Sequence, residues 1–249
     1  MKTEIQTVEG EFKLGADWPK LVYPALSDGL IIDWVADDLK VGPLTAPWQS
    51  RVSNTHPLSP LAESDTGIIP NEVKLDSNGH NYVEMLAGQR LRTWTIDWAI
   101  DQDITIMAVV RPRRPPEGSG LGTNSRIISG ANGGFRSILH TPGTYSIGVT
   151  GKTTRISSAS VFGRIEAVMG RYGKNIYDGK QYGQNLVVPT EPYADQKSVQ
   201  QYVLVGGNDT TQANAKLYGD LFRISIWDRL LTDQEMDAAL ADQAKTYGF

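Results

Sequence analysis

Two short stretches carry carboxylates at a spacing that could cleave a glycosidic bond. Glu72 and Asp76 lie four positions apart in one candidate strand, and Asp101 and Asp103 lie two apart before another. Positions i and i+2 or i+4 share one face of a strand, and a retaining glycoside hydrolase holds its two carboxylates about 5 Å apart. Polar ends of ordinary strands have the same pattern. We therefore expect neither pair to be catalytic, and we expect the protein not to be an enzyme.

Transition-metal chemistry has few candidate ligands in this chain. There is no cysteine, which excludes disulfides, thiolate metal sites and a cysteine nucleophile. His56, His80 and His140 include no i, i+4 pair, so the spacing of a zinc protease is absent. We interpret the three histidines as turn or surface residues.

Calcium is the one metal that the sequence leaves open. It prefers oxygen ligands, which Asn208, Asp209 and Asp220 could supply around the glycines at 206 and 207. Such residues are also common in any sandwich loop. We therefore expect no cofactor, with calcium at these three residues as the exception to test.

Exposed aromatic rings are the first candidates for contact with a ligand. Sugars stack on such rings, and Trp48 and Trp94 stand near predicted loops. We predict glycan contacts at these two tryptophans. Because most tryptophans of a sandwich are at least partly buried, we expect at most two of the six to be functional.

Arginines in a predicted loop are the second candidates for contact. Residues 111–122 are rich in proline and glycine, which predicts a long exposed loop, and include Arg111, Arg113 and Arg114. Residues 1–28 are polar, lack a sustained period and carry Trp18, so we interpret them as an arm. These four side chains are predicted to contact partner proteins, although a solvated loop and a loose lead-in are the alternatives.

Composition narrows the class of protein. The 25 glycines, 13 prolines and short apolar runs favour many strands joined by turns. A net charge of -4 argues against nucleic-acid binding, and no run approaches the ~20 apolar residues of a membrane span. The first 30 residues lack the apolar core of a secretory signal, which predicts synthesis in a cytoplasm without export.

Alternating segments predict the strands that would position these residues. A short loop at 77–79 joins two alternating runs as a hairpin, and the apolar run 103–112 predicts a strand buried on both faces. Three short strands follow between 126 and 149, and Asp178-Gly179 predicts a hairpin turn. With no linker-like composition after the arm, we expect one domain over residues 29–249.

The last fifth of the chain gives the clearest pattern. Residues 218–228 alternate, with Phe222, Ile224 and Ile226 on one face, which predicts a strand buried on one side. A capping box from Thr232 to Glu235 then begins a helix, and Gly248 stands at its expected C-terminal cap.

This ending resembles the close of laminin G-like domains in the concanavalin A-like lectin and glucanase superfamily. The resemblance consists of a glycine, an alternating strand and an Asp-Arg-x-Leu-Thr-x-x-Glu helix start, at Gly219, Asp228, Arg229, Leu231, Thr232 and Glu235. It implies an all-β antiparallel jelly-roll sandwich with one C-terminal helix. Neither carboxylate pair resembles the Glu-x-Asp-x-x-Glu run of the glucanase branch.

The resemblance, together with the missing export signal, implies a function. Our leading hypothesis is a non-catalytic structural or adhesion module of a bacteriophage particle, made in the host cytoplasm and located in the virion as a decoration, tail or fibre-associated protein. Its partners would be other virion proteins, further copies of itself and a host surface glycan. A carbohydrate-binding module is the alternative, and a glycan hydrolase is the second alternative.

Overall fold

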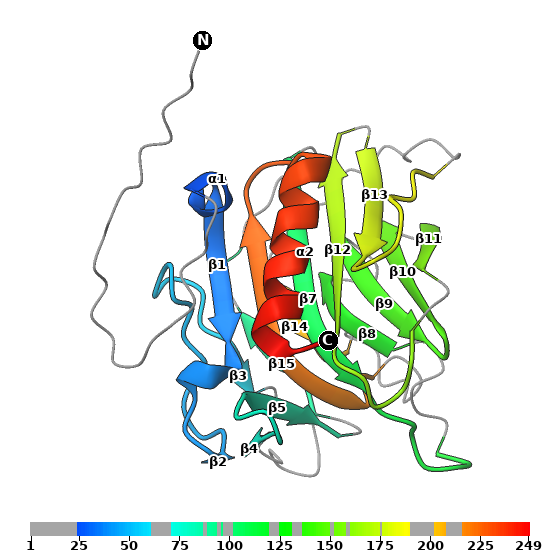
Figure 1. The fold of residues 1–249 in the computed structure, drawn as a ribbon. Helices are drawn as coiled ribbons and strands as arrows, with labels where there is room; N and C mark the ends of the chain where they lie inside the picture. Colours follow the sequence, from blue (N-terminus) through cyan, green and yellow to red (C-terminus); the bar gives the residue numbers. More distant parts are fainter. Residues whose placement is uncertain are drawn as a thin grey trace.

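Antiparallel strands in two stacked sheets dominate the described chain (Figure 1). The computed structural model describes residues 24–60, 71–86, 89–93, 96, 102–119, 125–130, 136–149, 152–157, 160–174, 176–189, 202–207 and 216–249. A long helix follows the last strand. The expected jelly-roll sandwich with a C-terminal helix is confirmed.

The first sheet contains eight strands among these residues. They are β1 (Leu30–Val35), β2 (Gly42–Pro43), β4 (Glu72–Leu75), β5 (Asn81–Met85), β7 (Ile104–Pro112), β12 (Glu166–Gly173), β13 (Ile176–Gln181) and β15 (Gly219–Trp227). Their order is β13-β12-β7-β15-β5-β4-β2. The first part of β15 pairs with β5, and the rest of the strand pairs with β1. The strand nearest the end of the chain thus lies at the centre of this sheet.

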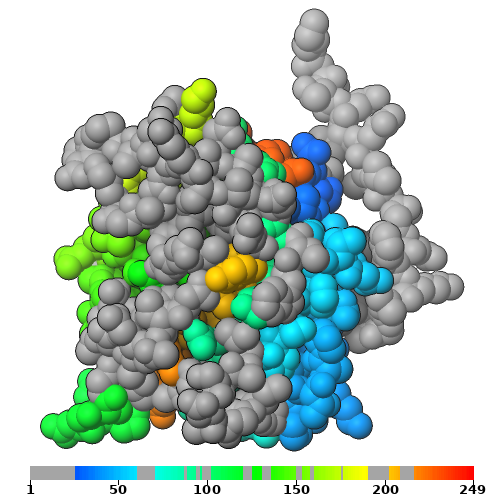
Figure 2. All heavy atoms as spheres, turned by 180° about the vertical axis from the view of Figure 1, so that it is seen from behind, coloured from blue at the N-terminus to red at the C-terminus, as the bar shows by residue number. Residues whose placement is uncertain are grey.

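The second sheet contains seven described strands. They are β3 (Ser59–Pro60), β6 (Leu91–Thr93), β8 (Ser125–Gly130), β9 (Ser137–Thr141), β10 (Thr144–Val149), β11 (Lys152–Ser157) and β14 (Val203–Val205). Their order is β11-β10-β9-β8-β14-β6-β3. Seen from behind, β14 lies near the middle of this side of the molecule (Figure 2). The three short strands predicted between 126 and 149 correspond to β8, β9 and β10.

The main core lies between the two sheets. Inward side chains of β7, such as Ile106 and Ala108, meet Ile138 of β9 and Ile147 of β10 in one buried cluster. Outward side chains of β7, such as Met107, belong to a second buried cluster on the other face of the first sheet. The prediction that the 103–112 strand is buried on both faces is confirmed.

A bulge in β15 changes which face its aromatic residue occupies. Val110 pairs with Leu221 and Val109 with Arg223, so Phe222 is an extra residue in the strand. Ile224 and Ile226 point into the main core, whereas Phe222 joins the second cluster. The prediction that these three residues share one face of a strand buried on one side is wrong. A pattern of alternating residues in the sequence does not reveal where a bulge interrupts the alternation.

Helix α2 (Asp233–Tyr247) covers the outer face of the first sheet (Figure 1). Both hydrogen bonds of the predicted capping box, between Thr232 and Glu235, are present, and Gly248 ends the helix with a φ of 73°. The helix packs its apolar side onto the second cluster through Met236, Ala239, Leu240 and Tyr247. None of the helices in the described ranges has the length and hydrophobicity that crossing a bilayer requires.

The described chain begins with a short helix that belongs to the domain. Leu26, in α1 (Pro24–Ser27), is fully buried in the second cluster, and its carbonyl accepts a 2.7 Å hydrogen bond from Trp227 Nε1. The proposed arm, residues 1–28, therefore includes a stretch that packs against β15. Its remaining residues, 1–23, lie outside the described part.

The predicted turn at Asp178-Gly179 is wrong. Both residues lie inside β13, which pairs with β12 along its length. Asp178 accepts two hydrogen bonds from Arg171, at 2.7 and 2.8 Å. A Cβ at Gly179 would lie against Met169 O. The glycine therefore permits a close approach between strands. By contrast, the hairpin predicted at 77–79 is confirmed by β4 and β5.

Candidate binding site on the outer face of the first sheet

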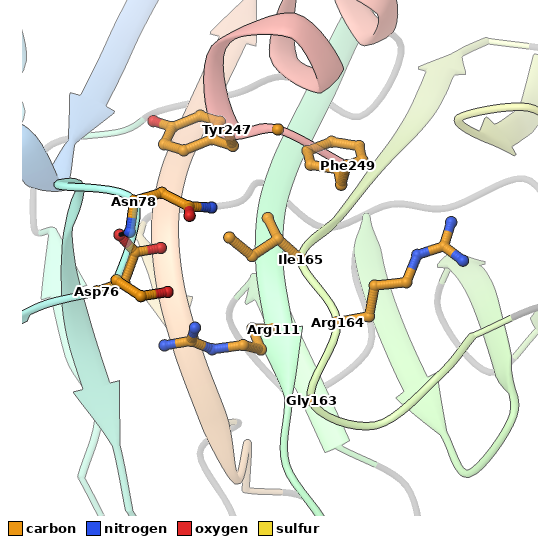
Figure 3. A pocket seen from close by; sticks show the side chains of 10 residues that line it. Asp76, Asn78, Arg111, Gly163, Arg164, Ile165, Tyr247 and Phe249 are labelled. Atoms are coloured by element: carbon orange, nitrogen blue, oxygen red, sulfur yellow. Dashed lines mark hydrogen bonds between the residues drawn. The ribbon is translucent and has the colours of Figure 1, made fainter.

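A hollow of about 340 Å³ opens on the outer face of the first sheet, beside the end of α2 (Figure 3). Four segments that are distant in sequence meet there: the β4–β5 turn, the end of β7, the approach to β12 and the residues after α2. Its lining residues are Asp76, Ser77, Asn78, Arg111, Gly163, Arg164, Ile165, Tyr247, Gly248 and Phe249.

The β4–β5 turn forms the polar wall of the hollow. Asp76 Oδ1 accepts hydrogen bonds from the backbone N–H groups of Asn78 and His80, both at 2.9 Å. Gly79 closes the turn with a φ of 88°. The same carboxylate thus fixes the turn and, through Oδ2, presents a second acceptor. Figure 3 shows Asp76 and Asn78 on the same wall, with Arg111 turned toward Asp76.

Arg111 forms the floor of the hollow from β7. Its Nε donates a 2.6 Å hydrogen bond to Asp220 Oδ2. Its guanidinium lies over the rings of Tyr82 and Phe222, 4.8 and 5.3 Å from their centroids. Ion pairing and cation–π contact together hold the group in one orientation.

Arg111 belongs to a larger group of side chains that we name the charged strip: Lys74, Glu84, Arg111, Arg113 and Asp220. Arg113 Nη1 donates to Glu84 Oε1 at 2.7 Å, and its Nη2 lies 2.6 Å from Asp220 Oδ1. Lys74 Nζ donates to Glu84 Oε2 at 2.6 Å. Each carboxylate in the strip is therefore bound by two cations.

Burial and ion pairing act in opposite directions on these acids. Burial raises the pKa of Glu84, but hydrogen bonds from Lys74 and Arg113 outweigh it and leave that pKa below its usual value. Burial also raises the pKa of Asp220, against the opposing effect of Arg111 and Arg113. Burial lowers the pKa of Arg113, but Asp220 and Glu84 outweigh it and raise that pKa. The strip thus holds its two carboxylates among three cations.

Aromatic rings support the hollow from below and from the side. Phe222 contacts Tyr247 at 5.4 Å and Tyr82 at 5.6 Å between ring centroids. Phe249 and Tyr182 form a T-shaped pair with 5.8 Å between their ring centroids. Of these rings, Phe249 is only half-buried and lines the opening, so it offers an apolar surface beside the polar wall.

The arrangement is suited to binding. Asp76 offers a hydrogen-bond acceptor, Arg111 a donor and Asn78 both, while Ile165 and Phe249 are apolar. The carboxylates of the charged strip, which includes Arg111, are bound by cations. Asp76 and Glu72, the sequence candidates for catalysis, are polar residues of a hairpin, as the alternative interpretation expected.

The arginines predicted to contact partners differ in their surroundings. Arg111 was expected on an exposed loop, and this is wrong, because it lies in β7, which ends at Pro112. Arg113 lies one residue beyond the strand, and both side chains bind Asp220. Arg114 is exposed, with its guanidinium 5.9 Å from the Phe162 ring centroid. Trp18, the fourth predicted contact, lies outside the described residues.

Tryptophan placement corrects the predicted glycan contact at Trp48. Trp48 is fully buried in the main core, where its Nε1 donates to Val35 O at 3.2 Å, so a sugar cannot stack on it. Trp34 and Trp227 are buried as well. A tryptophan beside prolines in a loop-like sequence gave no sign of this burial. Trp94 lies outside the described residues and stays a prediction.

One of the three proposed calcium ligands, Asp220, lies among the described residues. Asp220 lies in β15, within the predicted 218–228 strand, and its carboxylate lies between two guanidinium groups. Asn208 and Asp209 lie outside the described residues. Within the described ranges no three His, Asp or Glu side chains are grouped as metal ligands.

Two of the histidines have carboxylate or hydroxyl neighbours. His80 Nδ1 lies 3.0 Å from Asp37 Oδ2 beside the hairpin. His140 is buried, not at the surface as expected, and its Nε2 lies 2.9 Å from Ser160 Oγ. His56 is partly buried, and its carbonyl accepts a hydrogen bond from Trp34 Nε1. These contacts stabilise turns and the core.

The fold defines the class of protein: a two-sheet antiparallel β-sandwich with a C-terminal helix. Domain 4 of the extracellular GH43 arabinanase AbnA from Geobacillus stearothermophilus, solved with arabinotriose, is 11% identical, with a TM-score of 0.58 over 85% of this chain and 98% of that one. No family model matches the sequence, and no curated protein matches it.

Longer proteins share the same fold. The binding domain of Paraclostridial Mosquitocidal Protein 1 is 10% identical, with a TM-score of 0.59, over 88% of this chain and 53% of that one. Trypanosoma rangeli sialidase is 12% identical, with a TM-score of 0.58, over 86% of this chain and 33% of that one. This chain thus spans about half of the mosquitocidal binding-domain chain and about a third of the sialidase chain. At such identities the common property is the fold.

Proposed function

We propose that this protein is a non-catalytic binding module. One observation carries the proposal: the hollow presents donors, acceptors and an apolar edge, while the carboxylates of the charged strip are bound by cations. General acid–base catalysis needs a carboxyl group that can exchange a proton with a substrate. Glu84 and Asp220 instead hold strands in place, and Asp76 is the single Asp or Glu side chain among the described residues that line the hollow, whereas glycoside hydrolysis uses a pair.

The narrower proposal is an adhesion or structural module of a bacteriophage particle, in contact with other virion proteins or further copies of itself. The resemblance of the closing segment to laminin G-like domains supports it. Two of the predicted contacts remain candidates. They are Arg114, which is exposed, and residues 1–23, which lie outside the described part of the chain.

Incorporation into particles tests the narrower proposal. Particles released from the source strain would be purified, and an antibody against this chain would be used to label them for electron microscopy. Labelled particles support the proposal, and label only in the particle-free fraction contradicts it. Deletion of residues 1–23, ending before the buried Leu26, should then abolish incorporation if the arm makes the contact.

A carbohydrate-binding module is the second candidate, because domain 4 of the arabinanase has this fold and was solved with arabinotriose. Calorimetric titration of this protein with arabinotriose tests that ligand directly. Saturable binding, repeated with and without calcium, would favour the candidate. Release of shorter sugars during the same incubation would favour a hydrolase and contradict a purely binding role.

A further inference from the structure

We propose that the hollow beside α2 binds a neutral sugar residue through adjacent hydroxyl groups. The inference deepens the proposed binding function and rests on it. It names the ligand class for a site that is assembled only in the folded chain.

The polar groups of the hollow match the hydrogen bonding of a sugar. A hydroxyl group both donates and accepts, so two neighbouring hydroxyls need an acceptor and a donor placed together. Asp76 and Arg111 provide this pair, and Figure 3 shows the guanidinium turned toward the carboxylate. Asn78 adds an amide that can do either.

These polar groups are fixed before a ligand arrives. Two backbone N–H groups hold Asp76 through Oδ1, and Asp220, Tyr82 and Phe222 hold Arg111. A ligand therefore does not have to order flexible side chains, which is a large cost in binding.

Charge argues for a neutral sugar over an acidic one. Arg111 is paired with the fully buried carboxylate of Asp220, which it shares with Arg113. Asp76 has no cation bound to it among the described residues and would repel a ligand carboxylate. Arg164 also lines the hollow, but Figure 3 shows its side chain turned away from Asp76, Asn78 and Arg111.

Size and apolar surface agree with a small ligand. At about 340 Å³ the hollow lies near the lower end of the usual range for ligand pockets, roughly 300 to 1,000 Å³. Ile165 and the half-buried Phe249 provide an apolar edge for the C–H face of a sugar ring. The hollow therefore suits one or two sugar rings.

An array of neutral and carboxylate-bearing oligosaccharides, followed by calorimetry on the strongest neutral hit, tests the proposal. Asp76→Asn keeps Oδ1, and with it the turn, but replaces the second acceptor with a donor. Loss of one charge-assisted hydrogen bond should weaken binding about tenfold to a hundredfold. Phe249→Ala should weaken it as well. Asp28→Asn, at a side chain 83% exposed and away from the hollow, should leave binding unchanged.

Each outcome is decisive for the hollow. Neutral hits that weaken in Asp76→Asn and Phe249→Ala, and not in Asp28→Asn, support the proposal. Hits limited to acidic sugars, neutral hits unaffected by both hollow variants, or no hits at all would overturn it. Thermal unfolding checks that each variant is folded. If Asp76→Asn unfolds at a much lower temperature than the unmodified protein, Phe249→Ala decides the result. Particle labelling tests the adhesion or structural role in a particle separately, so that proposal can survive failure here.

Discussion

His140 is a buried titratable residue within a small polar network. Its Nε2 lies 2.9 Å from Ser160 Oγ, which donates to Glu166 Oε2 at 2.9 Å. Because the single hydroxyl proton of Ser160 goes to Glu166, Nε2 of His140 donates the proton in its bond to Ser160. Burial lowers the pKa of His140 to about 4, so the imidazole is neutral at physiological pH.

The stability of the protein should depend on pH through this residue. Between the ordinary pKa of 6.5 and the folded value of about 4, the unfolded chain binds the extra proton. The free energy of unfolding should therefore fall as pH drops through this window, by up to about 3 kcal/mol. Urea unfolding from pH 7 to pH 4 measures the slope. His140→Gln, which keeps a donor for Ser160, should flatten it, and an unchanged slope would contradict the assignment.

At the scale of elements, β12 and β13 depend on a close approach of their backbones. Gly179 in β13 leaves no room for a Cβ beside Met169 O of β12. The same position, read from sequence alone, suggested a turn, since Asp-Gly is a frequent turn pair. A glycine that serves a turn and one that serves a close approach look the same in a single sequence.

Gly179→Ala should destabilise the protein by about 1 to 3 kcal/mol, because the added methyl group meets backbone that cannot rotate away. Chemical denaturation measures the change. Gly183→Asn is a suitable control, since this position has open space and a φ of 73°, which asparagine tolerates. Equal stability of the Gly179→Ala variant and the unmodified protein would show that the strands can separate at low cost.

The start of α2 contains a second titratable group with a shifted pKa. Glu235 accepts hydrogen bonds from Arg229 at 2.7 and 3.0 Å and from Thr232 N at 2.7 Å. Arg229 is the main cause that lowers the pKa of Glu235 to about 2. The folded state thus favours the ionised carboxylate.

Glu235→Gln should lower the free energy of unfolding at pH 7 by about 2 kcal/mol after allowance for solvent screening. A depressed pKa contributes stability that is present above the unfolded value of 4.5 and is lost as pH falls through about 2. The difference between the variant and the unmodified protein should therefore shrink across that window. Glu117→Gln, at an exposed position, serves as the charge control. A difference that persists below pH 2 would assign the effect to packing.

For the whole molecule, the sequence predicted the sandwich because its strongest patterns are local. The β7 run, the hairpin at Gly79 and the capping box at Thr232 each need only neighbouring residues to be recognised. The hollow could not be predicted, since Asp76, Arg111 and Phe249 meet only after the sheet has formed. The bulge at Phe222 could not be predicted from the sequence either, because it arises from the way β15 pairs with β7.

Two truncations separate the arm from the domain. Removal of residues 1–28 should leave the protein at least about 2 kcal/mol less stable than removal of residues 1–23, because only the longer deletion empties the fully buried site of Leu26. It also leaves Trp227 Nε1 without its acceptor. Melting curves of the two truncated proteins measure the difference. Equal curves would show that α1 contributes nothing to the fold.

The position of β15 has a consequence for how the protein is made. This strand completes the first sheet by joining β7, β5 and β1, yet it begins only at residue 219. On the ribosome, the unpaired backbone edges of those three earlier strands remain open until their common neighbour emerges. Pairing between segments about 190 residues apart is slow to nucleate and leaves nascent chains open to aggregation. We expect chaperone demand to be highest just before β15 leaves the exit tunnel and to fall once α2 has followed it.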